Sequence, residues 1–138
     1  MLGGAQSCIA AFQLLTRLPF RVSVPYTEAV LSRSVAFYPL VGAVIGGILA
    51  VAGWLLERGL PPLPGGMILL AVWVYLTGAL HLDGLMDMAD GLLSHRSRER
   101  MLEIMKDSRV GAMGVIVGAL VLLLKGSMAA SLLGEGDW

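Results

Sequence analysis

The stretch VAFYPLVGAVIGGILAVAGWLL, residues 35–56, runs for 22 residues without a charged side chain. At 1.5 Å per residue, a helix of this length spans the ~30 Å hydrocarbon core of a bilayer. We therefore predict that residues 35–56 form a transmembrane helix. The rest of the chain is interpreted outward from this segment.

The composition supports a membrane protein with one domain over residues 1–138. Hydrophobic residues make up 57% of the chain and charged residues 14%, whereas soluble domains carry about 25% charged residues. Ten basic residues balance ten acidic ones, so net charge gives no indication of a nucleic-acid partner. The single cysteine, Cys8, excludes an internal disulfide framework.

Two further apolar runs follow the first. Residues 66–82 are interrupted by His81 near their end, and residues 110–133 are interrupted by Lys125. Residues 1–20 place their apolar side chains on one side of a helix that ends near Pro19, as expected for a helix lying in the membrane interface. The predicted fold is an all-α, polytopic membrane helix bundle with about three transmembrane helices plus interfacial helices.

The basic residues predict the orientation of these helices. Arg17, Arg21 and Arg33 precede the first span, Arg58 alone follows it, and five more basic residues lie within residues 83–109. Because cytoplasmic loops of membrane proteins are enriched in Lys and Arg, we expect the N-terminus and the 83–109 loop to face the cytosol. Small residues at four-residue spacing in the first and third spans predict close helix packing within the chain.

The segment HLDGLMDMADG, residues 81–91, carries Asp83, Asp87 and Asp90 at positions i, i+4 and i+7 of a helix. These positions share one face, where like charges destabilise a helix and no basic residue relieves them. Short carboxylate side chains suit Mg²⁺ or Mn²⁺. A divalent-metal site is therefore favoured over a merely solvated acidic face, with Asp107 as a further metal ligand or, alternatively, a salt-bridge partner of Arg109.

The residues after this acidic segment form a short basic helix. Ser97 is its predicted N-cap, and an apolar stripe lies beneath a charged face. An ordinary amphipathic interfacial helix has the same pattern. Its position beside the aspartates favours binding of a pyrophosphate, for which guanidinium groups are well suited. The candidate phosphate-binding residues are Arg98, Arg100, Lys106 and Arg109.

Two ionisable residues lie at or within the spans. His81 is included among the substrate-binding candidates, although it faces away from the aspartates and would act as a general base only if the helix were broken at Gly84. The alternative is a structural polar residue at a helix end. Lys125 is expected to snorkel or to pair with a buried acid, and a substrate role is the other interpretation.

Several of these segments together resemble the cobalamin synthase (adenosylcobinamide-GDP ribazoletransferase) family. The matching motifs are LTRLP at 15–19, FYPLVG at 37–42, HLDGL at 81–85 with Asp87, Asp90 and Gly91, and the run 96–109 with Gly111 and Gly114. The resemblance implies a transferase of the bacterial inner membrane that completes cobalamin biosynthesis and requires Mg²⁺. It implies that a ribose hydroxyl of α-ribazole, or of its 5′-phosphate, attacks adenosylcobinamide-GDP and releases GMP.

In that interpretation Asp83 and Asp87 are the catalytic residues, and Asp83, Asp87, Asp90 and Asp107 hold the metal. Members of the family continue beyond this length, so we expect the chain to be an N-terminal portion that works with C-terminal helices or as a homo-oligomer. One alternative is a CDP-alcohol phosphotransferase, but Asp83-Gly84 is followed by Leu-Met-Asp instead of that family's Ala-Arg. A transport or scaffold subunit is a third possibility, for which Lys125 is the one ionisable residue deep in a span.

Overall fold

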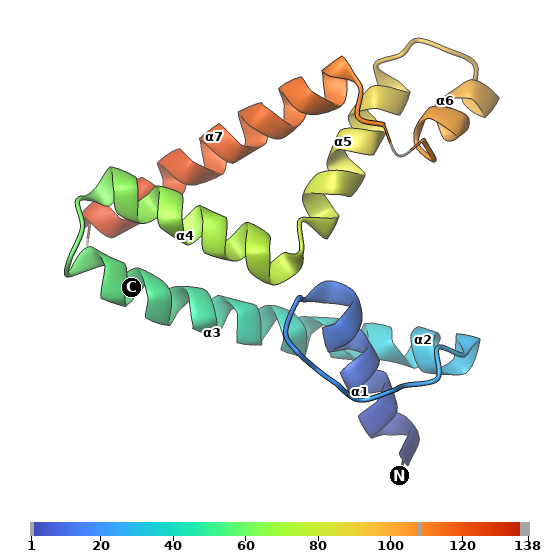
Figure 1. The fold of residues 1–138 in the computed structure, drawn as a ribbon, viewed down its shortest axis with the longest axis horizontal. Helices are drawn as coiled ribbons and strands as arrows, with labels where there is room; N and C mark the ends of the chain where they lie inside the picture. The colour runs from blue at the N-terminus through green and yellow to red at the C-terminus, as the bar shows by residue number, and fades with distance from the viewer. Residues whose placement is uncertain (1, 108, 136–138) are drawn as a thin grey trace.

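All regular structure is helical in the computed structural model, which describes residues 2–107 and 109–135 (Figure 1). The predicted all-α fold is therefore confirmed for these residues. In chain order the elements are α1 (Leu2–Leu15), α2 (Glu28–Ser34), the 3-10 helix η1 (Val35–Phe37), α3 (Tyr38–Glu57), α4 (Pro62–Thr77), α5 (Leu80–Leu92), α6 (Arg98–Ile104) and α7 (Ala112–Glu135).

The charge-free run at 35–56 lies inside a longer helical segment. Helices α2, η1 and α3 continue into one another over Glu28–Glu57, a span of 30 residues. Thr27 begins it, because its hydroxyl accepts a hydrogen bond from the Val30 N–H at 3.4 Å. Glu28 lies in the first turn, where the helix dipole favours a negative charge.

Two helices are long and apolar enough to cross a membrane, Glu28–Glu57 and Ala112–Glu135. A third span results if α4 and α5 are taken together, although an angle of 87° separates them. The second predicted span, 66–82, is thus divided: α4 ends at Thr77, and residues 80–82 belong to α5. The number of candidate spans agrees with the prediction of about three.

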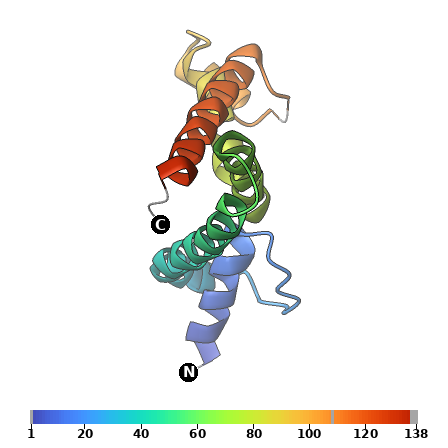
Figure 2. The same cartoon turned by 90° about the vertical axis from the view of Figure 1, so that its left-hand side faces the viewer.

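The helices form a narrow, open stack and not a closed bundle (Figure 2). In Figure 1, α4, α5 and α7 make three sides of a triangle, and α3 runs beside α4. The tightest point is the crossing of α4 and α7, where Gly66 lies against the backbone of Ala130. Many large apolar side chains on α3 and α7 are exposed, as expected for surfaces that contact lipid.

Helix α1 covers part of α3. Ala11 and Phe12 of α1 are buried against Val41 of α3. The loop after α1 folds back beneath it, because the Gln13 side-chain amide donates hydrogen bonds to the carbonyl oxygens of Phe20 and Val22, at 3.0 and 2.7 Å. The apolar side of α1 that predicted a membrane-interface helix therefore packs on protein.

The α4–α7 crossing gives a test of the fold. A Cβ at Gly66 would lie 2.6 Å from the Ala130 Cα, a backbone atom that cannot rotate away, whereas nothing lies within 4 Å of a Cβ at Gly47. We expect Gly66→Ala to lower the free energy of unfolding by about 1–3 kcal/mol, the usual effect of overpacking. Gly47→Ala is the matched control. Equal unfolding midpoints of the two variants in detergent would contradict the crossing.

Candidate functional site

The chain turns through 87° between α4 and α5, and this corner sets the direction of the helix that carries Asp83, Asp87 and Asp90. Gly78 and Ala79 both have left-handed backbone conformations, with φ of 62° and 61°. The Gly78 N–H donates to the Tyr75 carbonyl at 3.1 Å, and the Ala79 N–H donates to the Val74 carbonyl at 3.0 Å. These bonds close the end of α4 as a glycine C-cap does. The chain then leaves in a new direction.

Arg17 holds this corner from outside. Its backbone N–H donates to the Leu76 carbonyl at 2.8 Å, an acceptor that the end of α4 leaves without a helical partner. The Arg17 side chain lies over Gly78, so that a Cβ there would be 2.6 Å from Nε. The sequence interpretation used Arg17 only for topology; the signal for the corner was a glycine directly after a long apolar run.

Helix α5 carries all three aspartates of the acidic motif, and it continues through Gly84 without a break. Asp83 is exposed and Asp87 is partly buried. Among the described residues, neither carboxylate accepts a hydrogen bond from a side chain or forms an ion pair. Two acidic groups one helical turn apart are thus left available on one face.

Asp90 has a different environment. Its two carboxylate oxygens accept the backbone N–H groups of Gly111 and Gly114, each at 2.7 Å. These N–H groups lie at the start of α7, where four donors lack helical partners and the dipole favours a negative charge. Asp90 therefore caps α7 and fastens it to α5. A Cβ at Gly111 or Gly114 would collide with this carboxylate.

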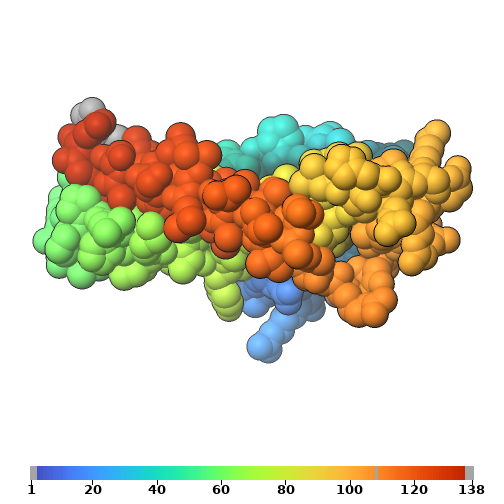
Figure 3. Space-filling model, turned by 90° about the horizontal axis from the view of Figure 1, so that it is seen from above, coloured from blue at the N-terminus to red at the C-terminus, as the bar shows by residue number. Residues whose placement is uncertain are grey.

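Helix α6 packs on α5 beside Asp87. Met105, just after α6, lies against Gly91 so closely that a Cβ on the glycine would be 2.8 Å from the Met105 Cγ. Gly91 is one turn after Asp87, so α6 docks on the same side of α5. Ser97 caps α6 as predicted, because its hydroxyl accepts the Arg100 N–H at 3.4 Å. Figure 3 shows α6 and its flanking loops at one end of the molecule.

The four basic candidates on this segment divide into two groups. Arg100 pairs with Glu103, and Arg109 pairs with Asp107 at 2.7 Å. Arg98 and Lys106 are exposed and form no ion pair among the described residues. Arg98 and Lys106 are therefore the two that remain available to an anionic ligand.

Asp107 adopts the salt-bridge alternative. The Arg109 side chain and backbone N–H donate to its carboxylate and lower its pKa from 3.8 to about 2. Among the residues that the structure describes, no three His, Cys, Asp or Glu side chains lie close enough to hold a metal ion together. The predicted set of Asp83, Asp87, Asp90 and Asp107 is thus not gathered in this conformation.

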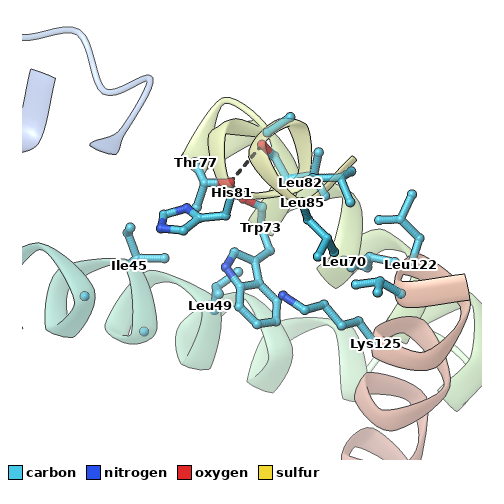
Figure 4. A pocket seen from close by; sticks show the side chains of 15 residues that line it. Ile45, Leu49, Leu70, Trp73, Thr77, His81, Leu82, Leu85, Leu122 and Lys125 are labelled. Atoms are coloured by element: carbon cyan, nitrogen blue, oxygen red, sulfur yellow. Dashed lines mark hydrogen bonds between the residues drawn. The ribbon is translucent and has the colours of Figure 1, made fainter. Parts of the chain in front are cut away.

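His81 lies apart from the other candidates. It lines a cavity between α3, α4, α5 and α7, together with Leu82 and Leu85. With 100° per residue, this side of α5 is roughly 170° from the mean direction of Asp83 and Asp87. The expectation that His81 faces away from the aspartates agrees with this placement. Lys125 points into the same cavity (Figure 4).

Comparison with known proteins gives a consistent result. The family model for cobalamin-5-phosphate synthase matches residues 7–138. An adenosylcobinamide-GDP ribazoletransferase of Pseudomonas aeruginosa strain UCBPP-PA14 is 51% identical over 133 residues, which cover 96% of this chain and 54% of that protein. The enzyme of the same name from Desulfitobacterium hafniense is 50% identical over 123 residues, covering 89% and 48%. No solved structure matches the chain.

The chain thus spans about half the length of these curated relatives. A protein from Acetivibrio thermocellus with the same name is 44% identical over 118 residues and covers the chain to 86%, with 48% of its own length aligned. The aligned part includes the corner, the acidic helix and the basic segment, since it extends over most of residues 1–138.

The Asp90 cap gives a second prediction. Asp90→Ala leaves the Gly111 and Gly114 N–H groups without their acceptor, and we expect it to lower the free energy of unfolding by about 1–3 kcal/mol. Gly114→Ala should act similarly, because its Cβ would lie 2.9 Å from the Met86 carbonyl oxygen. Gly84→Ala, on the same helix as Asp90, is the control, because no atom lies within 4 Å of a Cβ at Gly84. Hydrogen exchange of the first turn of α7 would report the loss directly.

The Asp107–Arg109 pair predicts a pH dependence. Because the folded pKa lies below the usual value, the pair stabilises the loop above pH about 4, and this contribution is lost as the pH falls towards 2. In the folded chain, the carboxyl carbon of Asp107 should titrate in NMR near pH 2. Arg109→Gln should return the midpoint towards 3.8. Arg98→Gln should leave it unchanged; a midpoint near 3.8 in the wild type would contradict the pairing.

Proposed function

Because the chain belongs to the cobalamin-5-phosphate synthase family, we propose that it forms the metal-binding part of a membrane ribazoletransferase. The reaction joins α-ribazole, or its 5′-phosphate, to adenosylcobinamide-GDP with release of GMP, the last assembly step of cobalamin biosynthesis. The proposal takes its substrates from the name that the relatives carry.

The observation that carries the proposal is that the three aspartates of α5 differ in their hydrogen-bond partners. Asp90 is occupied by the start of α7, whereas Asp83 and Asp87 present free carboxylates on the same face of a rigidly held helix. Helix α6 is docked on the same side of α5 as Asp87 and carries the available base Arg98, and Lys106 follows shortly after its end. Carboxylates next to guanidinium and ammonium groups suit a pyrophosphate substrate.

These residues fit magnesium. Mg²⁺ is commonly held by one or two carboxylates and completes its shell with water and substrate phosphates, so a full set of four protein ligands is unnecessary. Asp83 and Asp87 would hold the ion, and Asp107, once released from Arg109, would be a further ligand. The bound cation would polarise the attacked phosphoryl group and neutralise charge on the departing GMP.

The chain's own groups account for the remaining chemistry. Arg98 and Lys106 bind phosphate oxygens and orient the pyrophosphate, and Arg100 and Arg109 join them where substrate displaces their present partners. The ribose oxygen forms a bond to the phosphorus next to the cobinamide, and the bond from that phosphorus to the GMP oxygen breaks. The hydroxyl proton passes to one of the two free carboxylates, Asp83 or Asp87.

The arrangement also supports a location for the reaction. The inner membrane is the proposed site, with residues 83–109 facing the cytosol, because basic residues concentrate in this loop and before the first span. Nucleotide-linked substrates are then accessible to the acidic helix. The family match argues against the CDP-alcohol phosphotransferase alternative, as does the missing Ala-Arg after Asp83-Gly84.

Amide substitution of the free carboxylates tests the proposal. Asp83→Asn and Asp87→Asn remove the negative charge at nearly constant volume, so turnover should fall by on the order of 10²-fold or more. The assay follows GMP release from adenosylcobinamide-GDP with α-ribazole 5′-phosphate and Mg²⁺ in lipid vesicles. If the 138-residue chain alone is inactive, the assay uses it together with the segment equivalent to the second half of the Pseudomonas relative.

Glu57→Gln is the control. Glu57 is the last residue of α3, and this end of α3 lies far from the Asp83–Asp87 face of α5 (Figure 1). It should retain wild-type turnover. Full activity of both Asp83→Asn and Asp87→Asn would overturn the assignment of the site. Unchanged unfolding midpoints of the two variants would exclude misfolding as the cause of their loss.

A further inference from the structure

An open cavity of about 560 Å³ lies on the other side of α5, lined by residues of α3, α4, α5 and α7 (Figure 4). Its volume is within the range of about 300–1,000 Å³ that is usual for small-molecule sites. The walls are mostly aliphatic, with Trp73 as the one aromatic side chain. The polar side chains in the lining are Thr77, His81 and Lys125. Such walls suit a ligand that is largely apolar.

Lys125 is the unusual member of this lining. It lies near the middle of α7, a helix apolar enough to cross a membrane, where an ionisable side chain is rare and usually functional. Its ammonium group lies 3.9 Å from the centre of the Trp73 ring, a cation–π contact that offsets only part of the lost hydration. The residues lining the cavity, all of them described, include no carboxylate.

Among the described residues, no hydrogen bond joins Lys125 to the Thr77 hydroxyl, which donates to the carbonyl oxygens of Trp73 and Val74 in its own helix. His81, at the start of α5, adds an imidazole group to the lining beside the Lys125 cation. The cavity thus combines apolar walls with one cation, Lys125, and its lining residues include no carboxylate. Charge complementarity calls for a ligand with an apolar body and one anionic group.

This ligand does not belong to the phosphoryl-transfer site. The cavity side of α5 and the Asp83–Asp87 side point in nearly opposite directions around the helix axis, so a molecule in the cavity does not contact those carboxylates. Lys125 and His81 are both exposed, and the surrounding surface of α3 and α7 is apolar. A ligand therefore enters from the lipid phase.

We propose that the cavity binds an anionic membrane lipid, with an acyl chain among α3, α4 and α7 and the headgroup phosphate at Lys125 and His81. The anionic headgroup pairs with the Lys125 ammonium group, and the acyl chain fills the space between the helices. Because it contacts α5 from behind, it also supports the helix that carries the aspartates. This inference does not depend on the reaction proposed above.

Trp73 provides a direct probe of occupancy. In a Trp54→Phe, Trp138→Phe background it is the remaining tryptophan. The chain is placed in nanodiscs of phosphatidylcholine that contain either dibrominated phosphatidylglycerol or dibrominated phosphatidylcholine. The anionic lipid should quench Trp73 fluorescence at an about fivefold lower mole fraction than the zwitterionic one, as expected for one cation acting on one headgroup.

Charge and space are then varied separately. Lys125→Met should abolish the preference for the anionic lipid, and Lys125→Arg should keep it. Gly46→Leu should reduce quenching by both lipids, because Gly46 lines the cavity and nothing lies within 4 Å of its Cβ. Gly47→Leu is its neighbour control, outside the lining but equally uncrowded.

Four results would overturn the proposal. These are equal quenching by the two lipids in the wild type, a preference that survives Lys125→Met, equal effects of Gly46→Leu and Gly47→Leu, or loss of the preference when inorganic phosphate is added in excess. The last result would assign the cationic site to a water-soluble anion. The readout involves no catalytic activity, so failure of the transferase assay would leave this result intact.

Discussion

The structure depends on the corner at Gly78 and Ala79. Two successive residues with positive φ end α4 and begin α5 at 87° to it, and the Arg17 N–H holds the turn by donating to the Leu76 carbonyl near the end of α4. Glycine is required at the first of these positions because the Arg17 side chain occupies the place of a Cβ. Without the corner, α4 would continue straight and carry the aspartates along its own axis.

The corner fixes only the N-terminal end of α5. Asp90 removes that freedom by capping α7, and α7 returns to α4 at the Gly66–Ala130 crossing. Each vertex of the resulting triangle relies on a small residue or a helix cap, because only these allow backbones to approach closely. Asp83 and Asp87 lie on the side held at both ends, which suits a site that must keep two carboxylates in register.

The features that local periodicity controls were predictable from the sequence. The length of an uncharged run gave the helical spans, three aspartates at 83, 87 and 90 gave one helix face, and Ser97 gave the start of α6. Each of these depends on residues within a turn or two of one another. The Asp107–Arg109 contact was among the alternatives for the same reason, since its partners are two residues apart.

The features that the sequence left open depend on distant pairs. The partners of Asp90 lie 21 and 24 residues further along the chain, so spacing alone grouped it with Asp83 and Asp87 as a metal ligand. The division of the 66–82 run was also hidden, because apolar residues continue past Gly78 and hydropathy does not register a change of direction. Gly78 indicates only that a helix could end there, and the packing of Arg17 against it accompanies the change of direction.

The same geometry gives opposite sides of α5 different surroundings. On one side of α5, His81, Leu82 and Leu85 line the cavity, whereas elsewhere around the helix Gly91 contacts α6 and Asp90 bonds to the start of α7. Carboxylates are tolerated where water and cations reach them, whereas the apolar side allows polarity only where a charge finds a partner. The amphipathic pattern from which the sequence predicts a metal site therefore also places His81, Leu82 and Leu85 in the wall of the cavity. Both sides of α5 therefore depend on the orientation of this one helix.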